Sequence, residues 1–206
     1  MQSVVFEKKL NNAELGKGNV HDCYIREDSA FNFNEFKFVK SEMMSFWCPR
    51  SEKYYNGIHY EKFSNENRIA GFGDFFSDFS ITAADTVIIT GNISDGTREY
   101  IIDVKKAENV IVLVQSKNGF EILNTEKLSL INSNTKYKGE TFSIDYIRSV
   151  KKRSDAPSTT DYYVINVNGV PFNPELGKIF EIVIEGNIIS FRERKVWKKT
   201  IINTGD

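Results

Sequence analysis

The chain is poor in cysteine and has no long hydrophobic run. Its two cysteines, Cys23 and Cys48, have neither the spacing of a zinc site nor the number that a disulfide framework needs. The longest apolar runs, at residues 87–89 and 110–114, are far too short to span a bilayer, and the N-terminal residues lack the apolar core of a signal peptide. We therefore expect a cytoplasmic protein without a membrane partner and without a metal ion or another cofactor.

The chain also lacks an excess of positive charge. It has 27 Lys and Arg against 28 Asp and Glu, which gives a net charge of −1. A nonspecific nucleic-acid binder usually carries a basic excess, so this balance argues against that class and leaves specific binding open. Two stretches are locally basic, and each is either a solvated face or a set of contacts to DNA phosphates. The candidate phosphate contacts are Lys151, Lys152, Arg153, Arg194, Lys195 and Lys198.

Signatures of catalysis are scarce. The chain has no GxxxxGK phosphate loop and no nucleophile elbow. One segment, residues 100–105, is an apolar run that ends in Asp103-Val104-Lys105, and Asp85 lies upstream of it. This resembles the second half of the PD-(D/E)xK nuclease signature, in which an acid pair holds a divalent metal and a lysine helps to activate water. A strand that ends in solvated charge explains the motif more simply. A metal-dependent endonuclease that uses Asp85, Asp103 and Lys105 is therefore the alternative function.

Short apolar segments separated by turns dominate the rest of the chain. Strand pairs are predicted at residues 86–90 with 100–104, 109–115 with 119–123, and 179–184 with 188–191. Further strands are predicted at residues 4–6, 142–150 and 162–167, and the spacing of the phenylalanines between residues 31 and 38 indicates another. Residues 149–161 are charged and predict a loop. We expect a mainly β fold, a barrel or a sandwich, that forms one domain over residues 1–206. A boundary near residues 127–134 is a weakly marked alternative.

Residues 54–73, YYNGIHYEKFSNENRIAGFG, are the most informative segment. They contain too many strong hydrogen-bond donors for a core strand, because buried donors need partners. They are also too aromatic for a disordered linker. The segment is typical of an anchored surface arm that presents polar side chains. Asn, Lys, Arg, His and Ser are the side chains that contact base edges and phosphates.

Two stretches resemble the DNA-binding effector domain of EcoRII-type restriction endonucleases, a domain type that also occurs in the C-terminal half of BfiI. The first stretch is Val5-Phe6-Glu7-Lys8-Lys9-Leu10, followed by Gly16, His21 and Tyr24-Ile25; the second is Tyr54-Tyr55-Asn56, His59, Lys62, Asn65-Glu66, Arg68-Ile69 and Gly73. The resemblance covers residues 4–116. It implies a β-pseudobarrel related to plant B-three transcription-factor domains, from which an N-arm and a C-arm clamp the major groove of DNA.

The resemblance also implies which residues contact DNA. In the N-arm they are Lys8, Lys9, Lys17, Asn19, His21 and Tyr24. In the C-arm they are Asn56, His59, Lys62, Ser64, Asn65, Glu66, Asn67 and Arg68. The chain departs from the family pattern, because Ser64 and Asn67 replace basic residues and the segment after His21 is shorter. A different recognition sequence follows as a hypothesis.

Side-chain chemistry supports base contacts from the C-arm independently. Arg68 and Lys62 can donate to guanine O6 and N7, Asn65 or Asn67 can pair with adenine, and Glu66 can accept from cytosine N4. Each residue also has a structural alternative. The histidines can be hydrogen-bonded within the fold, the asparagines can form a turn, and Glu66 can be an internal ion-pair partner of Arg68 or Lys62. The flanking aromatics Tyr60, Phe63 and Phe72, with Ile69, are expected to pack the arm onto the barrel.

These features predict a sequence-specific double-stranded DNA recognition module of a bacterial restriction system. Since no convincing catalytic centre is present, the chain is expected to contribute no catalysis of its own. Such modules are fused to nucleases or to McrB-like GTPase motor subunits, so we expect a nuclease or motor subunit or fused domain as a partner. The last residues favour a piece of a longer protein. A third class, a β-barrel adaptor for protein partners, predicts no salt-sensitive affinity for DNA.

Overall fold

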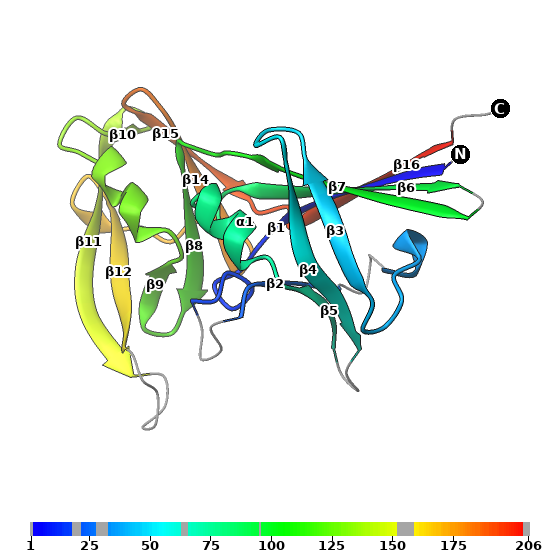
Figure 1. The fold of residues 1–206 in the computed structure, drawn as a ribbon. Coiled ribbons are helices and arrows are strands. Elements are labelled where there is room, and N and C mark those ends of the chain that lie inside the picture. Colours follow the sequence, from blue (N-terminus) through cyan, green and yellow to red (C-terminus); the bar gives the residue numbers. More distant parts are fainter. Residues whose placement is uncertain are drawn as a thin grey trace. The chain divides into compact units, whose positions relative to one another are not determined.

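The structure is a computed structural model that describes residues 2–17, 22–27, 33–62, 66–94, 96–151 and 159–203. It confirms the prediction of a mainly β fold, since strands account for most of the described elements (Figure 1). The chain divides into two compact units. We name them the sheet unit, Met1–Lys106 with Lys195–Asp206, and the barrel unit, Ala107–Arg194. The sequence predicted a single domain, whereas the structure divides into two units. The boundary at residues 106 and 107 also differs from the alternative boundary predicted near residues 127–134.

The sheet unit is built on one curled sheet of eight strands in the order β16-β1-β6-β7-β3-β4-β5-β2. A short helix, α1 (Gly73–Asp78), follows β5, and a short 3-10 helix, η1 (Phe33–Phe36), precedes β3. The strands are β1 (Gln2–Lys9), β2 (Tyr24–Arg26), β3 (Met43–Cys48), β4 (Lys53–Lys62), β5 (Asn67–Ala70), β6 (Thr86–Ser94), β7 (Thr97–Lys105) and β16 (Trp197–Asn203).

Alternation of apolar and polar residues explains the central strands of this sheet. Val87, Ile89 and Ile93 on β6 are buried, and Ile102 and Val104 lie on the buried face of β7. The two strands pair antiparallel over their whole length, from Thr86 opposite Lys105 to Ser94 opposite Thr97. This confirms the strand pair predicted at residues 86–90 and 100–104.

The strand predicted from the phenylalanines between residues 31 and 38 is wrong. Phe33 and Phe36 are both buried, but they lie on the 3-10 helix η1. Their spacing of three residues matches one turn of such a helix, whereas a strand would place them on opposite faces. Phe36 also packs against Gly91 of β6, where a Cβ atom would lie 2.6 Å from the ring. Phe31 lies outside the described residues.

The barrel unit closes on itself. Seven strands follow one another in the order β11-β10-β15-β14-β8-β9-β12, and β12 pairs back onto β11. Two further elements are a short strand, β13 (Val170–Pro171), which pairs with β12, and a 3-10 helix, η2 (Thr125–Leu130). The seven are β8 (Val110–Ser116), β9 (Gly119–Ile122), β10 (Lys136–Tyr137), β11 (Glu140–Lys151), β12 (Thr159–Val167), β14 (Ile179–Glu185) and β15 (Ile188–Glu193).

The barrel unit has its own apolar core, which includes Phe120, Phe142, Phe180 and Ile182. Its hairpins β8–β9 and β14–β15 confirm two predicted strand pairs. The two ends of the predicted loop at residues 149–161 are strand instead, because β11 extends to Lys151 and β12 begins at Thr159; the residues between them lie outside the described ones.

The buried carboxylate of Glu181 on β14 interacts with two arginines, Arg192 on β15 and Arg194 just after β15. Glu181 on β14 is fully buried, and its Oε2 accepts a hydrogen bond of 2.7 Å from Arg192 Nε. Arg194 Nε lies 3.8 Å from the other carboxylate oxygen, and only 2% of the Arg194 side chain is exposed. The charge of Arg194 is held inside the fold by a buried carboxylate, so this geometry gives the predicted contact of Arg194 with DNA phosphates no support.

Among the described residues, no helix has the length and hydrophobicity needed to cross a lipid bilayer.

Candidate nucleic-acid interface

Strands β4, β5 and β2 bring parts of the two predicted arms side by side at one end of the sheet. β4 and β5 form an antiparallel hairpin in which Glu61 lies opposite Arg68. β2, which belongs to the predicted N-arm, pairs antiparallel with β5 and forms the edge of the sheet, with Tyr24 opposite Ala70. The end of the first stretch that resembles the endonuclease domain, Tyr24-Ile25, is thus paired with the second stretch at β5.

The period-two alternation of strands separates the two faces of this three-stranded segment. Ile25, Ile58, Tyr60 and Ile69 are buried and hold it onto the core. The opposite face is polar and partly exposed, and we call it the recognition face. Its described side chains are those of Tyr24, Arg26, His59, Glu61, Arg68 and Ala70.

A close backbone contact anchors the hairpin at its inner end. Gly71 has φ +98°, and a Cβ atom there would lie 2.7 Å from the carbonyl oxygen of Gly57. Only glycine tolerates both this conformation and this approach. Phe72 is fully buried next to it. The expected packing roles of Tyr60, Ile69 and Phe72 match their burial, whereas Phe63 lies outside the described residues.

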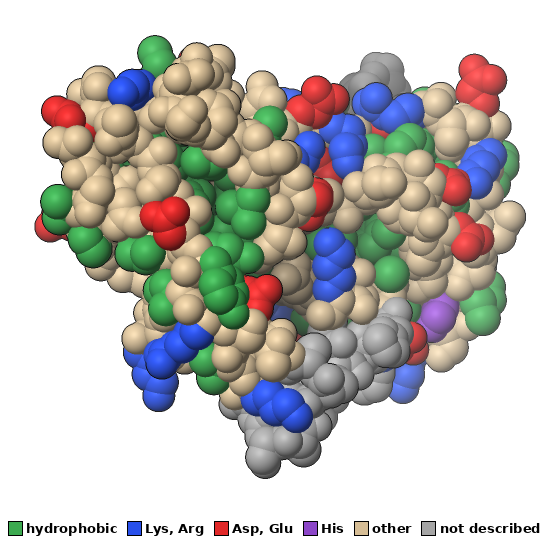
Figure 2. Space-filling model, turned by 90° about the vertical axis from the view of Figure 1, so that its left-hand side faces the viewer, with side chains coloured by type: hydrophobic (Ala, Val, Ile, Leu, Met, Phe, Trp, Pro, Cys, Tyr) green, Lys and Arg blue, Asp and Glu red, His purple; other side chains and the backbone are tan. Residues whose placement is uncertain are grey.

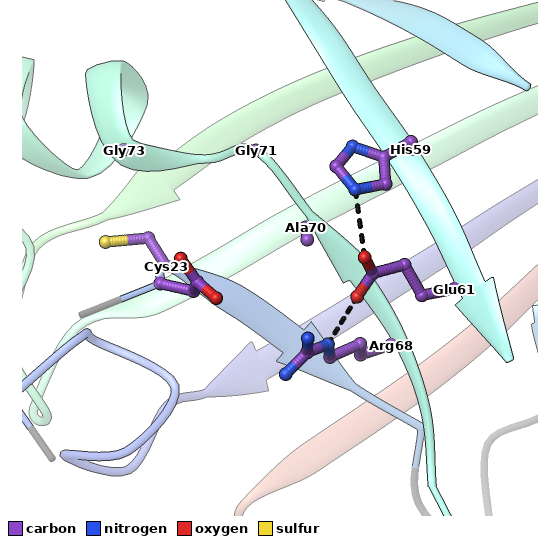
Figure 3. A pocket seen from close by; sticks show the side chains of 8 residues that line it. Cys23, His59, Glu61, Arg68, Ala70, Gly71 and Gly73 are labelled. Atoms are coloured by element: carbon purple, nitrogen blue, oxygen red, sulfur yellow. Dashed lines mark hydrogen bonds and ion pairs between the residues drawn. The ribbon is translucent and has the colours of Figure 1, made fainter. Parts of the chain in front are cut away.

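A chain of three polar side chains crosses the recognition face from β4 to β5 (Figure 3). His59 Nε2 lies 3.2 Å from Glu61 Oε1, and Arg68 Nε donates to Glu61 Oε2 at 2.5 Å. The hydrogen bond from Arg68 lowers the pKa of Glu61, outweighs the opposing effect of burial, and is reinforced by His59. The guanidinium carbon of Arg68 also lies 5.0 Å from the centre of the Tyr24 ring, within the range of a cation–π contact. Glu61 and Tyr24 therefore fix where the Arg68 guanidinium lies.

The outer ends of β2 and β5 are joined by side chains. Asn67 Nδ2 donates to the Glu27 carboxylate, and the Glu27 backbone N–H donates to the Asn67 carbonyl at 2.8 Å. Arg26 and Glu66 form an ion pair of 3.7 Å. Glu66 was expected to pair with Arg68 or Lys62 if it had a structural role, but its partner is on the neighbouring strand. These contacts give both Asn67 and Glu66 a role in holding the two strands together.

A cavity of about 380 Å³ opens on the recognition face. Its walls come from the chain that leads into β2, from β4 and β5, and from the segment that leads into α1 (Figure 3). Both small residues and charged groups line it. The lining consists of Asp22, Cys23, His59, Glu61, Arg68, Ala70, Gly71 and Gly73. Burial raises the pKa of the Cys23 thiol, and the neighbouring Asp22 carboxylate adds to this effect.

The base of the N-arm is organised by a buried ion pair. Lys8 on β1 is 4% exposed, and its ammonium group contacts the Glu14 carboxylate and donates to the Arg26 carbonyl at 2.6 Å. The same carboxylate accepts from the backbone N–H groups of Asn11 at 3.0 Å and Arg26 at 2.9 Å. The charge of Lys8 is held inside the fold, so this geometry gives the predicted contact of Lys8 with DNA no support.

The remaining predicted contacts are dispersed. In the N-arm, Lys9 is half-buried on β1 and Lys17 is exposed, while Asn19 and His21 lie outside the described residues. In the C-arm, Asn56 is exposed and accepts from Ser45 Oγ at 2.6 Å, and Lys62 is exposed at the end of β4. Ser64 and Asn65 lie outside the described residues. Three of the candidate phosphate contacts, Lys151, Lys195 and Lys198, are exposed, and Lys198 Nζ lies 3.5 Å from Glu7 Oε1. Lys152 and Arg153 lie outside the described residues.

The residues of the alternative nuclease site have separate structural partners. Asp85 is 1% exposed, and its Oδ2 accepts from the Thr82 backbone at 2.8 Å and from Lys106 Nζ at 2.6 Å. Asp103 accepts from Arg50 Nε at 2.9 Å, and Lys105 is exposed at the end of β7. Within the described residues, no cluster of three or more His, Cys, Asp or Glu side chains is arranged to hold a metal ion. A buried carboxylate bound to a lysine is poorly placed to take a metal, so this geometry gives the alternative no support.

Sequence reasoning missed part of the recognition face. It did not assign roles to Arg26 and Glu61 on this face, or to Asp22, Cys23 and Glu27 next to it. The alternation of Tyr60 and Ile69 with polar residues could have placed Glu61 and Arg68 on one face, but their pairing depends on the register of the hairpin. The roles of Arg26 and Glu27 depend on the β2–β5 pairing, for which the local sequence carries no signal.

No model of a protein family matches this chain, and a search of curated proteins finds no significant match.

Proposed function

We propose that the chain is a sequence-specific double-stranded DNA recognition module, and that the recognition face reads base edges in the major groove. The observation that carries this proposal is the pairing of β2 with β5. It brings Tyr24 of the predicted N-arm against Arg68 of the predicted C-arm, although each was selected from a separate stretch of sequence. A face built from both stretches is what a shared DNA-contacting role requires.

The geometry of Arg68 supports base reading rather than general attraction. Its side chain is 20% exposed and is held by Glu61 through Nε, the nitrogen nearest the backbone. Guanine is commonly read by an arginine that donates two hydrogen bonds to O6 and N7. Because the guanidinium is a rigid fork that is already held in place, little further side-chain freedom is lost when it binds a base.

The shape of the segment is also compatible with this role. The major groove admits a two-stranded β-ribbon, and some DNA-binding proteins read bases with strands. The β4–β5 hairpin is such a ribbon, and the exposed Lys62 and Asn56 lie on β4. Lys62 can contact a phosphate or guanine without disturbing any contact that holds the hairpin.

The distribution of charge favours specific over nonspecific binding. On the surface drawn in Figure 2, Lys and Arg side chains are scattered and alternate with Asp and Glu, and they do not gather into one basic patch. The recognition face itself carries Arg26 and Arg68 beside Glu61 and Glu66. Such a face gains little from phosphate attraction, so its affinity must come mainly from complementary contacts to particular bases.

The biological setting of the proposal rests on the resemblance to the EcoRII-type effector domain. On that basis the module serves a bacterial restriction system, and a nuclease or an McrB-like GTPase motor subunit supplies the catalysis. We thus propose that this partner, and not the chain itself, cleaves the DNA.

A pair of arginine variants tests the proposal. Arg68→Ala is expected to weaken binding to a duplex selected from a random library, while weak binding to unrelated duplexes stays the same. The discrimination lost should be about 1–3 kcal/mol, the contribution of one bidentate base contact. Arg98→Ala is the matched control, because Arg98 on β7 forms a comparable ion pair with Glu42 away from the recognition face. Equal effects of the two variants on both kinds of duplex would contradict the proposed role of Arg68.

A further inference from the structure

The cavity on the recognition face is left open by the absence of side chains. Gly71, Gly73 and Ala70 form part of its wall, and a Cβ atom at Gly73 would have no other atom within 4 Å (Figure 3). The volume of about 380 Å³ lies near the lower end of the range of about 300–1,000 Å³ that small-molecule sites occupy. The space therefore suits one small ring system better than a larger ligand.

The lining offers donors and acceptors close together. Arg68 supplies N–H donors, the carboxylates of Asp22 and Glu61 supply acceptors, and the His59 ring can act as either. The positive charge of Arg68 is offset by the two carboxylates, so the site does not favour a phosphate or another anion. A planar heterocycle with donors and acceptors along one edge, such as a nucleobase, matches this lining.

A cavity serves a different purpose from a protruding side chain. Base edges that stay stacked in a duplex are read by side chains that reach into the groove. A concave site is filled only by a group that leaves the stack, as in proteins that rotate a nucleotide out of the helix into a pocket. The cavity is lined by Asp22 and Cys23, which precede β2, and by residues of the β4–β5 hairpin, so a base that entered it would meet both predicted arms.

We propose that this cavity receives one nucleobase rotated out of the bound duplex and reads its hydrogen-bonding edge with Asp22 and His59, while Arg68 at its rim reads a neighbouring base in the groove. The proposal rests on the proposed DNA-binding function and adds to it a pocket in which one position of the recognition sequence is read. That position is then selected by its Watson–Crick edge, whereas the neighbouring positions are read in the groove.

Two measurements on the intact chain test the proposal, each with a duplex selected from a random library. First, each base pair of the site is replaced in turn by a mismatch that keeps one base and changes its partner. A mismatch at the rotated pair should tighten binding about tenfold or more, because the cost of unpairing no longer opposes binding. Second, 2-aminopurine or pyrrolocytosine at that position should gain fluorescence when the chain binds, since the base loses its stacking neighbours.

A pair of glycine variants links the effect to this cavity. Gly73→Leu fills the space with a side chain that meets no other atom at its Cβ, and it should abolish the fluorescence gain and weaken binding to the selected duplex at least about tenfold. Gly177→Leu is the matched control, because a Cβ atom there also meets nothing within 4 Å and Gly177 lies in the barrel unit. The control should bind as the unchanged chain does.

The outcomes separate this proposal from the proposed function. If the chain binds a selected duplex but no mismatch tightens binding and no fluorescence gain occurs, base rotation is refuted and recognition in the groove stands. If the fluorescence gain persists in Gly73→Leu, the rotated base lies elsewhere and the cavity is not its site. If no duplex is selected, both proposals fall. The mismatch series needs no variant, so it decides whether a base is rotated out even if Gly73→Leu does not fold.

Discussion

The buried ion pair between Lys8 and Glu14 gives the sharpest prediction for stability. The exposed fractions of the two side chains are 4% and 2%, so the pair is almost completely removed from water. Glu14→Ala leaves the Lys8 ammonium without its carboxylate and removes the acceptor for the backbone N–H groups of Asn11 and Arg26. Removal of one partner from a buried pair costs about 3–5 kcal/mol, and the two unsatisfied N–H groups act in the same direction.

Comparison of variants separates the charge from the hydrogen bonds. Lys8→Met with Glu14→Gln removes both charges and keeps a side-chain acceptor, so we expect it to cost less than about 2 kcal/mol. The surface pair of Arg98 and Glu42 is the control, and Glu42→Ala should cost less than about 1 kcal/mol. The double variant is thus expected to be more stable than Glu14→Ala, although it changes two buried residues.

Urea unfolding followed by tryptophan fluorescence measures these differences. Both tryptophans of the chain, Trp47 and Trp197, belong to the sheet unit, so their signal reports on the unit that contains Lys8 and Glu14. The free energy of unfolding and its dependence on urea are compared between variants. A loss of less than about 1 kcal/mol in Glu14→Ala, equal to that of the surface control, would refute the account of Lys8 as a buried structural charge.

Three further predictions concern the recognition face. Gly71→Ala should cost about 1–3 kcal/mol or more, because it combines a positive φ with a contact of 2.7 Å to Gly57. Gly96→Ala, which has a positive φ but open space and lies in the same unit, should cost less in the same urea assay. Glu61 has a lowered pKa, so its ion pair with Arg68 stabilises the fold above the unfolded pKa of about 4.3, and this stabilisation is lost as the pH falls through the folded value. Unfolding curves of the unchanged chain and Glu61→Gln should therefore converge in acid, and a constant difference down to about pH 2 would contradict this reading. Arg68→Lys should lose most of the discrimination that Arg68→Ala loses in duplex-binding titrations, because lysine lacks the planar fork; retention of full specificity would show that only charge matters.

Local signals made the strand pairs predictable. The β6–β7, β8–β9 and β14–β15 hairpins each combine alternating apolar residues with a short turn, and both signals lie within one stretch of sequence. The phenylalanines around η1 misled the prediction, because a count of apolar residues ignored the interval of three between Phe33 and Phe36.

The candidate site was harder to predict, because its geometry depends on pairings between distant segments. Val4, Phe6 and Lys8 share the buried face of β1, so the alternation of that strand could have placed Lys8 in the core. The burial of Arg194 could not have been inferred in this way, since Arg194 follows β15 whereas its partner Glu181 lies on β14. Likewise, the pairing of β2 with β5 carries no local signal, yet it determines which side chains share the recognition face.

Selection of bound duplexes from a random library tests the central proposal most directly. The account predicts that one sequence motif is enriched, that it binds at least about a thousandfold more tightly than unrelated duplexes, and that Arg68→Ala relaxes the selection at one position. Affinity for the enriched duplex should fall as salt rises, with a shallow slope because few phosphate contacts are expected. A library that emerges without enrichment at low and moderate salt would contradict the account and favour an adaptor for protein partners.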